Sequence, residues 1–297
     1  MTHIGVDTSA YLVGVPGHPD AAFSLDWAAQ TDVGLRRSHN EDSLIAVAPI
    51  FAVADGMGGH SAGDLASAAV VSRLEAVMAR GDATQPDTAQ PDTAQPDRAQ
   101  PDGHSHFTST AAIEIALAEA TDEISIAVDE KKLGIGTTVT GAALTLHEGR
   151  AYFTVFNVGD SRVYLFEGTE LRQVSIDHSL VQELVDTGMI TALAAESHPQ
   201  RNEITRAVGF NREQRPDYWQ IPLRGDIRLL ICSDGLTNEL EHATIQGVLA
   251  NRLGPPDTVR ELVNAALAAG GRDNISAIVV DVREVTPGEP EIHTAPR

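Results

Sequence analysis

The order of apolar segments along the 297-residue chain predicts an α+β domain in which mostly antiparallel sheets are covered by helices. Strand-like runs dominate, and the helices are grouped, whereas a doubly wound parallel sheet would alternate single helices with strands. An apolar content of 42% is enough for a full core, and aromatics at 4% leave Val, Ile, Leu and Ala to fill it. We expect one domain over 22–283, a loose lead-in over 1–21 and a disordered tail over 284–297.

In the first third of the chain we expect short strands followed by two long helices with apolar residues at helical spacing. The strands are expected at Ala22–Gln30, Ser43–Val47 and Phe51–Ala54, and the helices at Ser61–Arg80 and Thr108–Lys131. Between the helices, residues 82–102 form a pentapeptide array with a proline every five residues, which is incompatible with a helix and disfavours a sheet. We interpret the array as a disordered, tolerated insertion loop; a docking role is the alternative.

The remainder is expected to hold most of the strands. They are expected at Thr137–Leu146, Ala151–Val158, Arg162–Phe166, Leu171–Val174, Tyr218–Ile221, Ile227–Cys232 and Ile275–Val282. Gly149 and Gly168 are placed for hairpin turns. Helices are expected at Leu180–Thr187, shortly after His198-Pro199, at Thr244–Leu253 and at Asp257–Ala269.

The composition limits which binding partners and which cellular compartment are compatible with the chain. The net charge of −21 argues against nonspecific binding to nucleic acid or to an anionic membrane. The single cysteine, Cys232, cannot form an intrachain disulfide, and its apolar surroundings indicate a core residue in a reducing compartment. The chain shows neither a secretory signal nor an apolar run near ~18 residues. We therefore expect a soluble, cytoplasmic monomer.

Aspartates stand at the ends of several predicted strands, each beside Gly, Ser or Asn. They are Asp42, Asp55, Asp160, Asp234 and Asp273. Hard divalent cations prefer oxygen ligands, and neither a zinc nor a calcium-loop pattern is present, so the set predicts Mg²⁺ or Mn²⁺. Two such ions sharing a water would generate a hydroxide suited to hydrolysis of a phosphate ester. Arg37, in the loop before Asp42, is our candidate for binding the phosphoryl oxygens.

Each residue also has a simpler interpretation when taken alone. An Asp-Gly pair is usually only a turn. Asp160 could be a turn acid paired with Arg162, Asp273 could be a cap, and His60 could be a surface histidine. The joint occurrence of these residues is what favours a shared cation site.

Seven segments, in order, resemble the bacterial metal-dependent Ser/Thr protein phosphatases of the 2C type. They are TDVGLRRSHNEDS (31–43), VADGMGGHSAG (53–63), GTTVTGA (136–142), NVGDSRVY (157–164), HPQRNEITRAVG (198–209), LLICSDGLT (229–237) and GGRDNISAIVV (270–280). The resemblance covers about 22–283 and implies a four-layer α-β-β-α sandwich, two antiparallel sheets flanked by helices.

By position in these motifs, the resemblance implies a site for two Mn²⁺ or Mg²⁺ ions. Asp55 would bridge them, the Gly56 carbonyl would ligate one ion, and Asp234 and Asp273 would ligate the other. Asp42 would act mainly through metal-bound water.

The resemblance also assigns the remaining roles. Arg37, and not Arg36, matches the phosphate-binding arginine, and His60 is the candidate general acid for the leaving oxygen. A third, weaker ion would be held by Asp160 and the shared Asp234, with Asn202 as a weak further contact, and 177–215 matches a mobile flap.

The implied activity is hydrolysis of phosphoserine and phosphothreonine by attack of a metal-activated water on phosphorus, opposing a Ser/Thr kinase. The alternative is a signalling or binding module of the same fold, in which hydrolysis is incidental or absent. A third possibility is hydrolysis of small phosphate esters, which an open metal cleft would also accept slowly.

Overall fold

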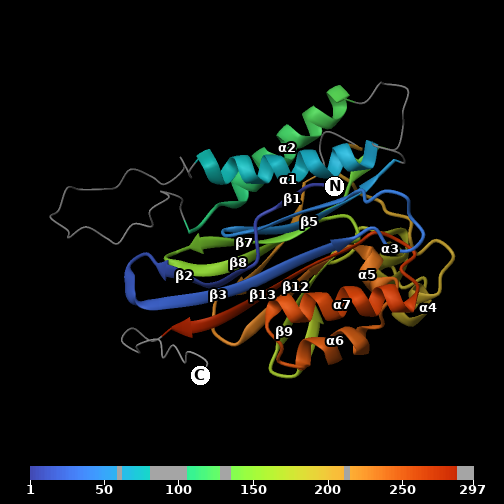
Figure 1. Ribbon diagram of the computed structural model, residues 1–297. Coiled ribbons are helices and arrows are strands. Elements are labelled where there is room, and N and C mark those ends of the chain that lie inside the picture. The colour runs from blue at the N-terminus through green and yellow to red at the C-terminus, as the bar shows by residue number, and fades with distance from the viewer. Residues whose placement is uncertain (59–61, 81–105, 128–134, 211–214, 286–297) are drawn as a thin grey trace.

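Two β-sheets lie face to face between two layers of helices (Figure 1). The computed structural model describes residues 1–58, 62–80, 106–127, 135–210 and 215–285. The architecture confirms the predicted four-layer α-β-β-α sandwich, and all strand pairs but one are antiparallel. The exception is the short β1, which runs parallel to β4.

The first sheet has the strand order β1-β4-β5-β7-β8-β11, with β6 paired to β5. Its strands are β1 (His3–Ile4), β4 (Asp42–Val47), β5 (Ile50–Met57), β6 (Gly136–Thr137), β7 (Val139–His147), β8 (Arg150–Val158) and β11 (Asp217–Pro222). A two-residue turn joins β7 to β8, and its Gly149 has a φ of +75°, as the hairpin prediction requires.

The second sheet has the strand order β10-β9-β12-β13-β3-β2. Its strands are β2 (Thr8–Val15), β3 (His18–Asp32), β9 (Arg162–Glu167), β10 (Glu170–Gln173), β12 (Ile227–Cys232) and β13 (Ile275–Val285). The turn between β9 and β10 contains Gly168 with a φ of +63°, again as predicted.

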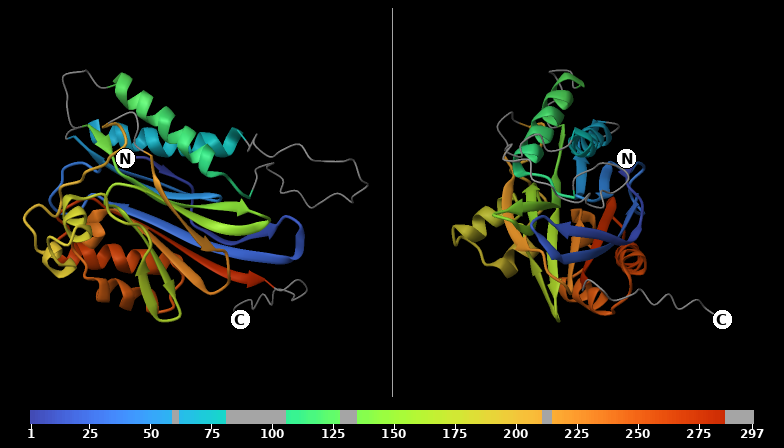
Figure 2. Two further views of the ribbon diagram at one scale, coloured as in Figure 1. Left: turned by 180° about the vertical axis from the view of Figure 1, so that it is seen from behind. Right: turned by 90° about the vertical axis from the view of Figure 1, so that its left-hand side faces the viewer.

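Helices cover the outer face of each sheet (Figures 1 and 2). The first sheet carries α1 (Ala62–Arg80) and α2 (Thr110–Ala127), and the second carries α6 (His242–Ala250) and α7 (Pro255–Ala269). Three short helices, α3 (Leu180–Asp186), α4 (Ala192–Glu196) and α5 (Asp234–Thr237), gather at one end of the sandwich, on the right in Figure 1. No helix in the described ranges is long and apolar enough to cross a membrane.

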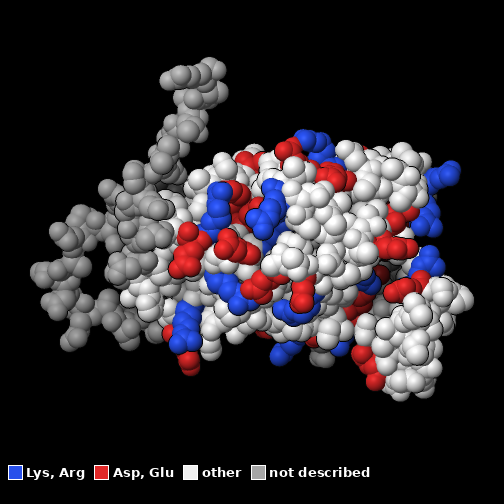
Figure 3. Space-filling model, turned by 90° about the horizontal axis from the view of Figure 1, so that it is seen from below, with Lys and Arg blue, Asp and Glu red and all other residues white. Residues whose placement is uncertain are grey.

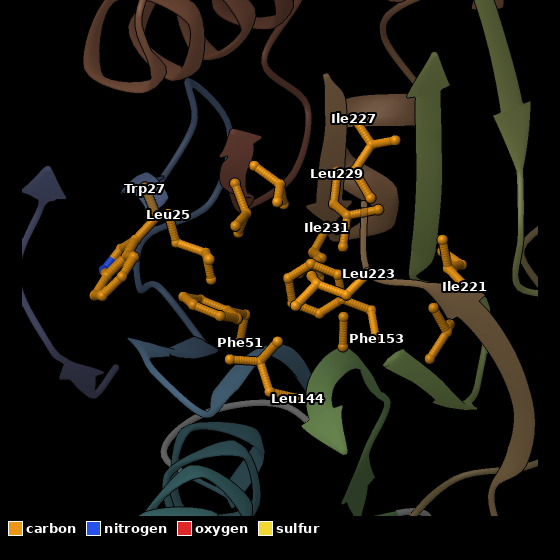
Figure 4. Packing of buried hydrophobic residues seen from close by; sticks show 14 of the residues in the cluster. Leu25, Trp27, Phe51, Leu144, Phe153, Ile221, Leu223, Ile227, Leu229 and Ile231 are labelled. Atoms are coloured by element: carbon orange, nitrogen blue, oxygen red, sulfur yellow. The ribbon is translucent and has the colours of Figure 1, made fainter. Parts of the chain in front are cut away.

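The core consists of three apolar layers, and β5 shows how one strand serves two of them. Phe51 and Val53 point between the sheets, whereas Ile50 and Ala52 face the helices α1 and α2. Both faces of the strand are therefore buried, which explains why its sequence is continuously apolar. Figure 4 shows the layer between the sheets, where Phe51 and Phe153 pack against Leu25, Leu144 and Ile231. Cys232 lies on the opposite face of β12, fully buried, as predicted for a core residue.

The main difference from the sequence prediction lies in the lead-in. We expected residues 1–21 to be loose, but β1, β2 and the start of β3 occupy them, and β2 adds an edge strand to the second sheet. A second difference is α5, a single helical turn that follows β12 directly and was not predicted. His60, the array at 82–102 and nearly all of the tail at 284–297 lie outside the described residues.

The acidic balance of the chain does not produce a uniformly acidic surface. On the face shown in Figure 3, acidic and basic side chains lie next to one another instead of gathering in one patch. Several are paired, such as Arg224 with Glu167 and Arg283 with Asp26. Such exposed pairs contribute little to stability, on the order of 0–1 kcal/mol each.

Candidate metal centre

The five predicted aspartates come from strand ends at the end of the sandwich where α5 lies. Asp42 begins β4 and stands directly opposite Asp55 of β5 in the strand register. Asp160 lies in the turn between β8 and β9, Asp234 begins α5 directly after β12, and Asp273 precedes β13 by two residues. Five carboxylates from five chain segments are thus brought together by the pairing of the two sheets.

Asp42 is the most deeply buried member, with no exposed surface. Its Oδ2 accepts hydrogen bonds from the Ser276 hydroxyl at 2.6 Å and the Ser233 hydroxyl at 2.9 Å. Its Oδ1 is buried without a hydrogen-bond partner. Burial raises the pKa of Asp42 to about 7, against the two serine hydrogen bonds, which lower it.

Asp55, Asp160 and Asp234 are partly exposed and interact strongly with one another. Burial raises the pKa of all three carboxyl groups, and repulsion from neighbouring aspartates raises it further. The Asp55 and Asp234 carboxyl groups interact directly, and burial is the main cause of the raised pKa of each. A bound divalent cation would relieve this repulsion.

Asp273 is held by the candidate phosphate-binding arginine. The Arg37 guanidinium donates to Asp273 Oδ2 at 2.7 Å, across 236 residues of chain. The backbone N–H of Asn274 donates to the other oxygen, Oδ1, at 2.8 Å. Arg36 is exposed and makes no ion pair within the described ranges. The two adjacent arginines therefore differ, and only Arg37 reaches the carboxylate cluster.

Gly56 is required by the packing of β5 against the start of α1. A Cβ on Gly56 would lie 2.2 Å from the Gly63 carbonyl oxygen and 2.6 Å from that of Glu41. The backbone carbonyl of Gly56, a predicted ligand, is thereby fixed beside Asp55.

These carboxylates do not form a ready-made cage. In the part of the chain that the structure describes, no three His, Cys, Asp or Glu side chains converge in a metal-binding arrangement. Asp273 faces Arg37, and Asp55 faces Asp234. The donor set nonetheless fits a hard divalent cation, because it is all oxygen and contains a buried, unpartnered oxygen in Asp42.

The sequence prediction missed one acidic residue of this region. Glu41 Oε1 is buried without a hydrogen-bond partner, as Asp42 Oδ1 is. The Glu41 backbone is held by the Asn274 side chain at 2.9 Å and the Ser67 hydroxyl at 2.5 Å. The available signal was the pair of adjacent acids, Glu41 and Asp42, of which we named only the second.

The structure shows which acid pairs with Arg162, the partner that the simpler interpretation gave to Asp160. Arg162 makes its ion pair with Asp177, with three contacts of 2.6 to 3.0 Å, and not with Asp160. Asp160 therefore faces the other aspartates, chiefly Asp234. Asn202 is exposed, and among the described residues its side chain forms no hydrogen bond with this set.

The predicted flap at 177–215 is anchored next to Asp160. The backbone N–H of Gly159 donates to His178 Nδ1 at 3.1 Å, and His178 Nε2 lies 3.1 Å from Asp217. This arrangement ties the start of the flap to the Asp160 turn and to β11. The apolar side chains of Met189 and Leu193 are exposed at 73% and 76% in the α3–α4 segment.

Comparison with known proteins agrees with the fold and with the motif order. The family model "Protein phosphatase 2C" matches residues 36–269. The chain is 34% identical over 259 residues to the protein phosphatase PhpP of Streptococcus pneumoniae, covering 86% of this chain and 96% of that protein. It is 35% identical over 265 residues to the serine/threonine protein phosphatase PstP of Mycobacterium tuberculosis, covering 89% of this chain and 46% of PstP. The chain thus spans about half the length of that relative.

Solved structures extend the likeness to three dimensions. The crystal structure of Mycobacterium tuberculosis PstP superposes with a TM-score of 0.72 at 33% identity, covering 87% of this chain and 99% of that one. A structure of the PstP catalytic domain in complex with two manganese ions superposes with a TM-score of 0.69 at 32% identity, covering 88% and 99%. The family match, the identity and the shared fold together establish that this chain belongs to the protein phosphatase 2C family.

Proposed function

We propose that the chain is a metal-dependent phosphoprotein phosphatase that hydrolyses phosphoserine and phosphothreonine. The observation that carries this proposal is the cluster of five aspartates, in which Asp42 keeps a buried carboxylate oxygen without a protein partner. Burying so many carboxylates together is unfavourable without a cation to share them. The two manganese ions reported for the PstP catalytic domain support this assignment for the same fold.

Two Mn²⁺ or Mg²⁺ ions would be held by the residues at the strand ends. One ion would be held by Asp55 and the Gly56 carbonyl. The other would be held by Asp55, Asp234 and Asp273. A third, weaker ion would be held by Asp160 and Asp234. When bound, the ions lower the pKa of water toward neutrality and polarise phosphoryl oxygens. The raised pKa of Asp55 and of Asp234 implies that ion binding displaces protons from the cluster.

The phosphoryl group would be oriented by Arg37, whose planar fork matches two phosphate oxygens. Arg37 now donates to Asp273 and is half exposed, with 51% of its side chain accessible. Because its partner Asp273 is also a predicted metal ligand, the Arg37 guanidinium lies beside the place where the ions would be held. His60 would protonate the leaving seryl or threonyl oxygen.

The biological setting forms part of the same proposal. Phosphoproteins modified by a Ser/Thr kinase are the substrates that this chemistry fits. The single free thiol, Cys232, is buried and suits a reducing, cytoplasmic compartment. We propose that the chain acts there as a monomer.

The test is release of phosphate from a phosphothreonine peptide with Mn²⁺, with Mg²⁺ and with excess chelator. We expect metal-dependent release that disappears in Asp55→Ala. Asp257→Ala is a matched control, because Asp257 is an exposed surface acid paired with Arg260. If the folded wild-type chain released no phosphate with either metal, the binding-module alternative would replace this proposal.

A further inference from the structure

A network of hydroxyl groups joins the two sheets beneath the aspartate cluster. Ser233 follows β12, Ser276 lies in β13 and Asp42 begins β4, so the contacts among them link the second sheet to the first. All three residues are fully buried, with no exposed surface. None of the roles proposed above uses either serine.

The direction of each hydrogen bond follows from the donors available. Ser233 Oγ accepts from the Ser276 backbone N–H at 3.0 Å, so its own proton is free for Asp42 Oδ2 at 2.9 Å. Ser276 Oγ lies 2.6 Å from the same oxygen and 2.8 Å from Thr31 Oγ1. Ser276 has one hydroxyl proton, and the shorter distance and the charge of the carboxylate favour its donation to Asp42 over Thr31. Thr31 in turn accepts from the Asn40 amide at 2.8 Å.

The consequence is a sharp asymmetry between the two oxygens of Asp42. Oδ2 is saturated by two hydroxyl donors, whereas Oδ1 is buried and has no partner. An unpartnered buried carboxylate oxygen is costly, by more than the ~1–3 kcal/mol of a neutral polar group. The side chains around Asp42 are those of Asp55, Asp234 and Asp273, which are themselves carboxyl groups, so a cation or its coordinated water would supply the partner that Oδ1 lacks.

We propose that Ser233 and Ser276 are positioning residues that fix the Asp42 carboxylate with Oδ1 directed to the metal site. This inference rests on the proposed metal-dependent function. The hydroxyls are suited to the task because they are neutral: they hold the carboxylate without bringing a positive charge that would compete with the ion. Arg37 on Asp273 shows the contrasting case, in which a cationic partner occupies a ligand oxygen.

The experiment measures Mn²⁺ affinity of the full chain by isothermal titration calorimetry for Ser233→Ala and Ser276→Ala. Loss of groups that orient metal ligands typically weakens metal affinity by about 10–100-fold, and we expect a decrease in this range for each variant. Ser175→Ala is the matched control, since Ser175 is also buried and its hydroxyl likewise accepts a backbone N–H bond, from Val163 at 3.0 Å. Its Mn²⁺ affinity should equal that of the wild type.

Two further variants separate positioning from packing. Thr and Val have nearly the same shape, but Thr keeps the hydroxyl group and Val replaces it with a methyl group. Ser276→Thr should therefore retain Mn²⁺ affinity, and Ser276→Val should lose it. In an Asp42→Asn background, Ser276→Ala should have no further effect, because the charged oxygen that it positions is gone. Should a Ser276 variant fail to fold, Ser233→Ala with its Ser175→Ala control remains a complete test.

The outcomes distinguish this inference from the function on which it rests. Wild-type affinity in Ser233→Ala and Ser276→Ala, with an active wild-type enzyme, would overturn the positioning role alone. Equal losses in Ser276→Thr and Ser276→Val, or in Ser175→Ala, would also overturn it by showing a packing effect. A folded wild-type chain that neither binds Mn²⁺ nor releases phosphate would overturn the proposed function and this inference together.

Discussion

Two of the buried polar clusters among the described residues differ in how completely their polar groups are hydrogen-bonded. Under α6 and α7, Arg228 uses all five of its N–H donors. They bind both oxygens of Asp281 at 2.6 and 2.7 Å, the carbonyls of Leu249 and Leu253, and the Thr258 hydroxyl. At the strand ends, five aspartates lie close enough to repel one another, and Asp42 Oδ1 is left without a partner.

The difference indicates that the Arg228 cluster stabilises the fold, whereas the aspartate cluster is suited to binding a cation. A buried charge is tolerated when its hydrogen bonds are complete, as they are around Arg228. The aspartate cluster lacks that completeness and is held in place by the surrounding sheets, at a cost to stability that a bound cation would offset. Each prediction below changes one cluster and asks whether stability and metal affinity respond separately.

The largest effect on folding is expected from Asp281→Ala. It leaves the Arg228 guanidinium, whose side chain is only 10% exposed, without its carboxylate, which typically costs about 3–5 kcal/mol. Urea denaturation should show this loss, while the Mn²⁺ affinity of the folded variant should be unchanged. Asp257→Ala removes an exposed pair and should cost less than about 1 kcal/mol. Similar losses in the two variants would contradict the structural role given to the Arg228 cluster.

The next largest effect is a dependence of stability on pH in the chelated protein. The pKa of Asp42 is raised to about 7 by burial, so the folded state binds more protons than the unfolded state between about pH 4 and pH 7. Stability must therefore fall as pH rises through this window, by up to about 4 kcal/mol for Asp42 alone. Thermal denaturation in chelator should show the fall, and saturating Mn²⁺ should reduce it. A melting temperature that rises across this window would contradict the placement of Asp42.

The two clusters also differ in how far the sequence predicts them. The aspartates were predictable, because each one lies at the edge of an apolar run, and strand ends in a sandwich meet at a shared edge. The hydroxyl network was not, since Ser233 and Ser276 carry no periodic signal and their common contact, Asp42, is about two hundred residues away. The same holds for Arg37 and Asp273, which only the folded topology brings together.

The fold was predictable wherever burial imposed a pattern. The strands β5 and β12 are apolar on both faces, so their positions were found to within a few residues. The edge strand β2 was missed because half of its residues are exposed, Ala10 adopts a φ of +56°, and its register against β3 shifts twice. An edge strand with these irregularities has no alternation for sequence reasoning to detect.

Asp234→Asn should abolish activity without lowering the stability of the fold. Removing one buried charge relieves repulsion, so the chelated variant should be at least as stable as the wild type. Loss of a direct ligand should weaken Mn²⁺ binding by more than about 100-fold and nearly abolish turnover, exceeding the effect of groups that only orient ligands. Calorimetry, phosphate release and chelated denaturation measure the three quantities, with Asp257→Asn as control. Near-normal turnover would remove Asp234 from the site.

Arg37→Ala should separate phosphate binding from metal binding. Loss of the guanidinium should raise KM for a phosphopeptide by about tenfold, since hydrogen bonds to charged groups contribute about 1.5–3 kcal/mol. The same change frees Asp273, so Mn²⁺ should bind more tightly. The adjacent Arg36→Ala is the matched control and should change neither quantity. An equal increase in Mn²⁺ affinity in both variants would show that the loss of one positive charge near the site causes the effect, and not the loss of the Arg37–Asp273 contact.

The smallest effect is expected from deleting residues 82–102. The proline in every fifth position of this array predicts a segment without helix or sheet, and such a segment adds no packing contacts to the core. Shortening a flexible connection several-fold changes its closure free energy by only about 1 kcal/mol, in the stabilising direction. Phosphate release should stay at the wild-type rate. Because α1 and α2 on either side of the array pack on the sheet that carries Asp42 and Asp55, denaturation would also report any strain from the shortening. A large loss of activity or stability would mean that the array contacts the domain, and the docking interpretation would then replace that of a tolerated insertion.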